Sequence, residues 1–239
     1  MKYYYDLHIH SCLSPCASND MTPNNIVNMA KLKGLDIVAV TDHNTAKNLK
    51  PVLACAKKAG ICALAGMEVE SAEEIHLLTL FADLQSCLKL EEYISKALPN
   101  IKNNTSIFGD QLISDNQDEI IGSVENLLVT ATTRTLEQIV SYTNDLGGVC
   151  VPAHIDRDSY SIISTFGVMP EHVSFSTVEV SPKGIIKEYG EDSLWLNRYN
   201  VISSSDAHYL WGIAERGQFF EMKECSAKAV IEILKQQKN

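Results

Sequence analysis

The sequence has 239 residues, of which 45% are hydrophobic and 21% are charged, and its formal net charge is −10. This composition is typical of a globular protein, and the length suits one large α/β domain or two small ones. The acidic balance argues against an extended nucleic-acid surface. Such a surface needs clustered basic residues, and the 20 lysines and arginines are expected to be scattered.

Membrane and secreted proteins are also disfavoured. No run of about 18 apolar residues is present to span a membrane, and the first residues, MKYYYDLHIH, lack the apolar stretch of a secretory signal. The seven cysteines are odd in number and include no Cys-X-X-Cys pair, which favours reduced thiols. We therefore expect a location in the cytoplasm and no membrane partner.

The chain begins with an expected strand over residues 3–9, in which His8 and His10 share one face because strand side chains alternate. A helix is expected over 22–34, with a capping threonine, a proline at its first position and a closing glycine. The apolar run at 35–40 predicts a buried strand that leads into the sequence TDHN.

The same rhythm continues along the chain. Further helices are expected at 48–60, 84–98, 135–148 and from about 226, and further strands at 61–66, 74–81, 149–154, 177–181 and 200–208. About seven strands alternating with helices predict an α/β fold with a parallel sheet closed into a TIM-like barrel. Residues 100–134 interrupt the rhythm. We expect them to form a hairpin around Asp115 and Asn116, inserted in a single domain of residues 1–239 and covering the pocket.

Ligand-type side chains recur where these strands end. The residues are His8, His10, Asp42, His43, Glu68, His76, His154, Asp206 and His208. Because the carboxyl ends of parallel barrel strands open on one face, these side chains are expected to converge there. Burying so many polar groups is unfavourable unless something compensates them, and a cluster of metal ions would do so. Imidazole and carboxylate ligands together favour Zn, Mn or Fe.

The sequence resembles the PHP family, the polymerase and histidinol phosphatase domain of metal-dependent phosphoesterases. The motifs that carry the resemblance are DLHIHS, TDHN, GMEVES followed by EIHLL, PAH and SSDAH, in the family's order. The resemblance implies a distorted seven-stranded barrel that holds two or three divalent metal ions.

The resemblance also implies a ligand set for each ion. The first ion would be held by His8, His10, Glu68 and Asp206, and the second by Glu68, His76 and His154. The third would be held by His43 and His208, together with a residue of the loop after the first strand. Pro15 stands where family members often carry an aspartate or histidine, so Asp20 is the first candidate for that ligand and Cys16 the second.

Other charged residues are expected to support the site. Asp42 is expected to face away from His43 and to hold the ligands from behind. Asp6 either plays a similar part or is a buried carboxylate hydrogen-bonded to backbone. Arg157, just after His154, is the first candidate to bind the substrate phosphate. Weaker candidates are Arg134, Lys183, Arg198 and Arg216.

Such a site is expected to hydrolyse a phosphate ester. A hydroxide shared by two metal ions would displace the leaving group, with the ions held by Asp206, His208, His43 and Glu68. We expect a stand-alone phosphoesterase that acts on a small phosphorylated metabolite, such as a nucleotide or an amino-alcohol phosphate. The alternatives are an exonuclease acting on nucleic-acid ends, a hydrolase of carbon–nitrogen bonds and a non-catalytic metal-binding module.

Overall fold

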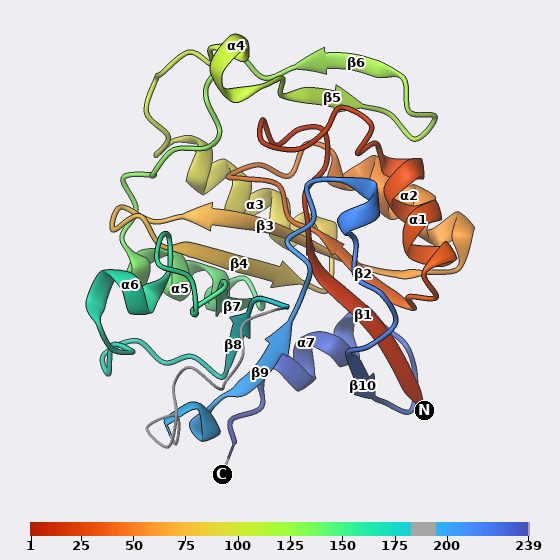
Figure 1. Ribbon diagram of the computed structural model, residues 1–239. Coiled ribbons are helices and arrows are strands. Elements are labelled where there is room, and N and C mark those ends of the chain that lie inside the picture. The colour runs from red at the N-terminus through yellow and green to blue at the C-terminus, as the bar shows by residue number, and fades with distance from the viewer. Residues whose placement is uncertain (183–194, 239) are drawn as a thin grey trace.

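The computed structural model describes residues 1–182 and 195–238. Its centre is a six-stranded sheet in the order β10-β1-β2-β3-β4-β7 (Figure 1). The strands of this sheet are β1 (Lys2–Ile9), β2 (Ile37–Val40), β3 (Cys62–Glu70), β4 (His76–Phe81), β7 (Val149–Pro152) and β10 (Phe219–Glu221). Two separate pairs are formed by β5 (Leu112–Ser114) with β6 (Ile120–Ser123) and by β8 (Thr177–Val180) with β9 (Asn200–Ser203).

The strand directions differ from the all-parallel sheet that the sequence predicts. β1, β2 and β3 are parallel, but β4 runs antiparallel to both β3 and β7, and β10 runs antiparallel to β1. The segment between β3 and β4 is too short for the helical crossover that a parallel pair requires, so these strands form a hairpin. The main sheet has six strands in the described residues, and the expected count of seven is not confirmed.

The sheet curls, and its two sides approach each other through β8 and β9. Ile155 N, just after β7, donates to Glu179 O of β8 at 2.9 Å. His10 N, just after β1, donates to Ala207 O after β9, also at 2.9 Å. This curled α/β architecture is consistent with a TIM-like barrel, and it brings together the residues that follow β1, β7 and β9.

The described residues also form helices. They are α1 (Pro23–Leu32), α2 (Leu49–Ala59), α3 (Leu84–Ser95), α4 (Thr105–Phe108), α5 (Leu136–Asp145), α6 (Ile162–Phe166), α7 (Ala227–Lys235) and the 3₁₀ turn η2 (Leu210–Gly212). α1 and α2 lie side by side (Figure 1), and Val27 and Val52 pack in one cluster with Val38 of β2. α5 begins with a capping box formed by Thr135 and Gln138. Among the described residues, no helix is both long and apolar enough to cross a membrane.

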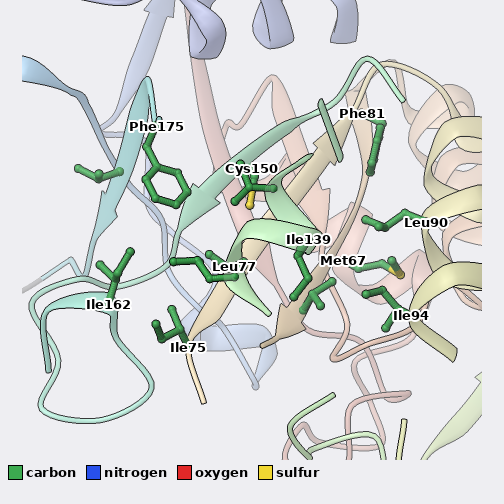
Figure 2. Packing of buried hydrophobic residues seen from close by; sticks show 14 of the residues in the cluster. Met67, Ile75, Leu77, Phe81, Leu90, Ile94, Ile139, Cys150, Ile162 and Phe175 are labelled. Carbon is green, nitrogen blue, oxygen red and sulfur yellow. The ribbon is translucent and has the colours of Figure 1, made fainter. Parts of the chain in front are cut away.

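One large apolar cluster joins β3 and β4 to α3 and α5. Figure 2 shows Met67 of β3 and Leu77 of β4 near Leu90 and Ile94 of α3 and Ile139 of α5, and all five side chains are buried. Full burial of one such side chain stabilises the fold by roughly 1.5–3 kcal/mol. This core therefore fixes β3 and β4, whose adjoining ends carry residues of the candidate site.

The expected hairpin of the insertion is present as β5 and β6, and it packs on the loop that follows β1. Leu112 N donates to Cys12 O at 2.8 Å, and the Asn48 amide bonds the backbone of β5 through both its nitrogen and its oxygen. Gly109 has a φ of 96°, and a Cβ atom there would overlap the carbonyl oxygen of Pro15. The insertion therefore fixes the loop after β1, which lies beside the candidate site.

Candidate metal centre

Ligand-type side chains from β1, β3, β4 and the loops after β2, β7 and β9 converge on one point. Asp206 and His208 are partly exposed, and the others are buried. β4 reaches this point with its first residue, His76, because the hairpin pairs that residue with Glu70 at the end of β3. The residues that meet are His8, His10, His43, Glu68, His76, His154, Asp206 and His208.

The Glu68 carboxylate lies at the centre of this cluster. Its side chain is 1% exposed, and its two oxygens lie 2.9–3.3 Å from ring nitrogens of His8, His10, His43, His76 and His154. Burial by itself would raise the pKa of this carboxyl. The surrounding histidines outweigh that effect and hold the pKa of Glu68 well below its usual range. Glu68 is therefore ionised, and its two oxygens can serve two cations.

The described part of the chain contains three groups of possible metal ligands. Within each group, the ligand atoms all lie within 4.8 Å of one another. The groups are His8 with His10, Glu68 and Asp206; His43 with Glu68 and His76; and His10 with His43 and His208. The first has the same members as the set implied for the first ion. In the second, His43 stands where His154 was expected, and His154 Nε2 lies 3.3 Å from Glu68 Oε1. In the third, His10 takes the place of a loop ligand.

The loop after β1 does not place Asp20 at the third group. Asp20 is exposed and belongs to none of the three groups. The N–H of Ser18 donates to His208 O at 2.9 Å, and Asp20 follows this contact on the exposed side. The expectation for Asp20 is therefore not supported. Cys16 is also exposed and belongs to none of the three groups, although desolvation of its sulfur and the charge of Glu68 raise the pKa of its thiol to about 12.

Two partners hold His8 and His10 from behind. His8 Nδ1 lies 2.9 Å from Glu179 Oε2. Ser14 Oγ donates to Asp42 Oδ1 at 2.7 Å, so its oxygen accepts the proton on Nδ1 of His10 at 2.9 Å. Both rings, assigned in this way, present Nε2 to the cluster. Sequence reasoning missed Glu179, although an acidic residue inside an apolar strand is a signal, because such a residue needs a partner.

The atoms that face the centre fit a metal ion. His8 Nε2 and His10 Nε2 lie 3.2 Å apart, and both face the carboxylates of Glu68 and Asp206 at 3.1–3.3 Å. His43 Nδ1 is buried 3.1 Å from Glu68 without forming a hydrogen bond. Such a gathering of lone pairs and negative oxygens is unfavourable unless protons or metal cations lie among them. This donor set is the kind that Zn, Mn and Fe prefer.

Protons and metal ions compete for these nitrogens. Burial opposes protonation of His8, but Glu179 and Glu68 outweigh burial and raise its pKa well above the usual range. Burial likewise opposes protonation of His76, and Glu68 nevertheless raises its pKa to about 9. Burial instead lowers the pKa of His208 to about 4. A metal ligand must be a neutral imidazole, so metal binding displaces the protons of His8 and His76.

Asp42 lies behind the cluster rather than within it. Its oxygens accept hydrogen bonds from the N–H and hydroxyl of Ser11 and from the hydroxyl of Ser14, at 2.6–2.7 Å. Asp42 therefore reaches His10 through Ser14, in the direction away from His43 that the strand alternation predicts.

Asp6 is a buried carboxylate beside the segment that carries Asp206. It accepts from the N–H and hydroxyl of Ser205 and from Ala214 N, at 2.6–3.0 Å. These bonds fix the segment that carries Asp206, whose φ is 51°. His154 also has a positive φ, of 31°. Strained backbone at two candidate ligands is typical of functional sites, where the surrounding structure holds it in place.

A small cavity of about 100 Å³ lies against the cluster. Arg157 lies on its wall with 40% of its side chain exposed, and its Nη1 is 2.7 Å from Asp206 Oδ2. The ring of Tyr160 stacks on that of His76, with centroids 4.8 Å apart. The other lining residues are His43, Glu68, His154, Ser159 and His208. None of the described residues that line the cavity belongs to the insertion. That the insertion covers the cavity therefore stays a prediction.

The weaker basic candidates lie elsewhere. The guanidinium groups of Arg134 and Arg216 each stack on a tyrosine ring. Arg198 lines a different cavity, and Lys183 lies outside the described residues. His172, the histidine that is not part of the cluster, forms an exposed ion pair with Glu137.

Comparison with known proteins gives a family match and partial relatives. The model of the PHP domain matches residues 6–157. An uncharacterized protein of Methanocaldococcus jannaschii is 35% identical over 100 residues, which are 38% of this chain and 58% of that protein. A 5′-3′ exoribonuclease of Haemophilus influenzae is 32% identical over 86 residues, which are 35% of this chain and 30% of that protein.

Solved structures share the fold. The lesion-specific endonuclease PfuEndoQ from Pyrococcus furiosus has a TM-score of 0.74 and 21% identity, over 98% of this chain and 56% of that one. Endonuclease Q with a 27-mer duplex that carries an abasic lesion has a TM-score of 0.65 and 21% identity, over 88% of this chain and 50% of that one. A structure from Bifidobacterium adolescentis described as a metal-dependent phosphoesterase has a TM-score of 0.59 and 16% identity, over 97% and 95%.

These matches correct two expectations. We expected a small phosphorylated metabolite as substrate and no extended nucleic-acid surface. Endonuclease Q contradicts both expectations, because it matches along nearly the whole chain and holds duplex DNA in one structure. Net charge misled the prediction because it averages over a surface on which charge can be segregated. The expected class, a metal-dependent hydrolase of phosphate esters, is confirmed.

Proposed function

The chain belongs to the PHP domain family, and from this premise we propose that it is a metal-dependent nuclease, a hydrolase of phosphodiester bonds in nucleic acid. The observation that carries the proposal is the cluster around Glu68, which opens on a cavity with Arg157 on its wall. The likeness to Endonuclease Q and to an exoribonuclease supports nucleic acid as the substrate. The chain spans about half or less of those two proteins, so the proposal concerns the catalytic step and not their whole activities.

The proposed cofactors are two or three divalent ions, of Zn, Mn or Fe, held by residues of the cluster. The first would be held by His8, His10, Glu68 and Asp206, the second by Glu68 with His76, His43 and His154, and the third by His10, His43 and His208. Such ions act as Lewis acids on a phosphoryl oxygen and activate water.

The chain's own side chains set up this chemistry. Glu68 keeps its negative charge because five histidines surround it, and its two carboxylate oxygens would serve as ligands to the ions. Asp206 faces both the ligands of the first ion and Arg157. Arg157 has further N–H donors that can bind a phosphate oxygen at the cavity mouth. Tyr160, stacked on His76, forms part of the cavity wall.

We further propose that residues 1–239 form one domain, built on a barrel of seven strands. In that barrel, β8 and β9 would follow β7 and return to β1, which agrees with the hydrogen bonds of Ile155 to Glu179 and of His10 to Ala207. β10 would lie outside the barrel as an added edge strand. The insertion would serve to hold the loop after β1 against the site, through Asn48 and the close contact at Gly109.

The test is a cleavage assay with labelled oligonucleotides, in single-stranded, duplex and abasic-site duplex form, with Mn, Zn, Fe or Mg added. We expect metal-dependent cleavage that a chelator abolishes, and the product lengths separate internal cleavage from trimming of ends. His8→Ala and Asp206→Ala should abolish cleavage, and His172→Ala is the matched control, because His172 pairs on the surface away from the site. Absence of cleavage with every metal, or cleavage that survives both site substitutions, would refute the proposal.

A further inference from the structure

Positive charge in this acidic chain is concentrated on α1, α2 and the residues next to them. Six of the sixteen lysines lie between residues 31 and 58, and the same stretch holds two aspartates and no glutamate. Asp42 is buried, and Asp36 accepts a hydrogen bond from Tyr4 N at 2.8 Å. Five of the lysines are exposed: Lys31, Lys47, Lys50, Lys57 and Lys58. The basic residues are therefore not scattered, as the sequence suggested, but partly gathered.

The fold turns these lysines outward on one layer. The apolar faces of α1 and α2 pack on β2. Part of the outer side meets the tip of the insertion at Asn24 and Cys55, and the five lysines are exposed beside it. Lys50 and Lys57 are seven residues apart on α2 and share its exposed face. Neither helix carries an acidic residue that would neutralise them. Acidic residues lie nearby in two places: Glu215 Oε1 is 3.0 Å from Lys33 Nζ, and Asp118 at the tip of the insertion accepts from Asn24 N at 2.9 Å.

An exposed aromatic pair lies between this layer and the metal centre. Tyr209 and Trp211 are 49% and 77% exposed, and their rings stack with centroids 5.6 Å apart at an interplanar angle of 16°. They directly follow His208, and three residues of chain reach at most about 11 Å. Large exposed aromatic groups are unfavourable in water and are typical of binding surfaces. Stacked flat rings are the groups on which nucleic-acid bases stack.

The segment that carries the aromatic pair adjoins the first of the two lysine-bearing helices. η2 packs on α1, and Lys33 Nζ donates to Trp211 O at 2.9 Å. On the other side, Ser18 N donates to His208 O, which ties the segment to the loop after β1. Figure 1 shows the blue chain after β9 rising past the end of β1 to lie beside α1.

We propose that η2 and the outward faces of α1 and α2, together the η2–α1–α2 surface, bind a strand of nucleic acid that leads to the metal centre. Tyr209 and Trp211 stack on bases, and the exposed lysines neutralise backbone phosphates. This inference rests on the proposed function for its substrate class. Binding measurements test it, so this surface and the proposed nuclease activity can be refuted independently of each other.

The first measurement is binding of a labelled single-stranded oligonucleotide with phosphorothioate links, which resist hydrolysis, by the protein as purified. The variant Lys50→Gln/Lys57→Gln/Lys58→Gln removes three charges from the surface. We expect it to weaken binding at least about tenfold and to lower the dependence of log affinity on log salt by about two to three, since each lost phosphate contact removes about one. The matched control, with the same charge change at exposed lysines elsewhere, is Lys89→Gln/Lys223→Gln/Lys228→Gln.

The second measurement uses Trp211 as its own reporter. The chain has two tryptophans, so Trp195→Phe leaves Trp211 alone, and its fluorescence should be quenched when the oligonucleotide binds. Trp211→Ala should weaken binding by about tenfold and Trp211→Phe should restore most of it, because stacking on one base is worth roughly 1–3 kcal/mol. Phe166→Ala, an exposed aromatic outside the surface, is the control.

Two results would overturn the inference. One is binding that the lysine and tryptophan variants leave at the level of their controls, with Trp211 fluorescence unchanged. The other is polyglutamate displacing the oligonucleotide at equal charge concentration, since an acidic polypeptide carries charge but no bases to stack. The surface variants should still cleave at high enzyme concentration, because the metal centre is unchanged. Such cleavage would support the proposed function even if the binding measurements refute the surface.

Discussion

Glu179 Oε2 lies 2.9 Å from Nδ1 of His8 and also accepts the backbone N–H of His154 at 3.2 Å. One buried carboxylate on β8 thus orients one candidate ligand through its ring and a second through its backbone. A carboxylate behind a metal-bound histidine fixes the ring and raises its basicity. The strand β8, which carries no ligand itself, therefore contributes to the metal centre.

The first prediction concerns metal affinity. Glu179→Gln keeps an acceptor for His8 but removes the charge, and we expect metal affinity to fall about tenfold; Glu179→Ala, which leaves Nδ1 without a partner, should cost up to about a hundredfold. Titration with Zn or Mn followed by calorimetry measures both. Glu137→Gln, an acid at an exposed pair with His172, is the control and should bind like wild type.

The second prediction concerns pH. Because His8 and His76 have raised pKa values, at about 9 for His76, metal binding at neutral pH should release protons and tighten as the pH rises. The raised pKa of His76 means that its protonated ring stabilises the metal-free fold. This stabilisation is fully present below the usual pKa of histidine and is lost as the pH rises through about 9. The melting temperature of chelator-treated protein should therefore fall from neutrality to about pH 9, and that of Glu68→Gln should fall less. Identical slopes for the two proteins would contradict this account.

The third prediction assigns Arg157 to substrate binding. Arg157→Ala should raise KM for an oligonucleotide by about ten- to a hundredfold, because a charge-assisted hydrogen bond to phosphate is lost, and Arg157→Lys should lose less. Steady-state kinetics separate KM from kcat. If kcat falls while KM stays unchanged, Arg157 acts by holding Asp206 and not by binding phosphate. Arg216→Ala, whose guanidinium stacks on Tyr4, serves as control.

The fourth prediction concerns the support of the site by the insertion. Gly109→Ala combines a positive φ with overlap onto Pro15, whereas Gly60→Ala has the positive φ and open space around it. We expect Gly60→Ala to cost about 1 kcal/mol and Gly109→Ala to cost at least about 2 kcal/mol more. Urea denaturation gives both values. Gly109→Ala should also weaken metal binding, since the loop after β1 holds Ser14 behind His10.

The sequence predicts most of the metal cluster because its members follow strands that the apolar pattern marks clearly. His8 and His10 alternate with Leu7 and Ile9 at the end of β1, and five of the six cluster histidines lie at or just after the end of a strand. His76 arrives by a different route, since β4 runs antiparallel and brings its first residue, not its last, to the site. Strand direction depends on the pairing partner, and the residues of the strand alone do not encode it.

Long-range contacts account for what the sequence could not show. Glu179 meets His8 across 171 residues, and only the curled sheet brings them together. Asp20 has the right chemistry for a ligand, but the turn at Ser18 takes it to the surface. The sequence itself shows six lysines between residues 31 and 58, but that α1 and α2 lie side by side appears only in the structure. Each of these facts depends on tertiary placement, for which local periodicity carries no signal.

The central claim is tested most directly by the substitution Glu68→Gln, which keeps the size of the residue and removes the charge that five histidines surround. Bound metal and cleavage of an oligonucleotide are measured on the same preparation, together with the melting curve. The account predicts a folded protein with fewer bound ions and at least about a thousandfold less cleavage, since metal ions supply several kcal/mol of transition-state stabilisation. Cleavage and metal content equal to those of wild type would contradict it.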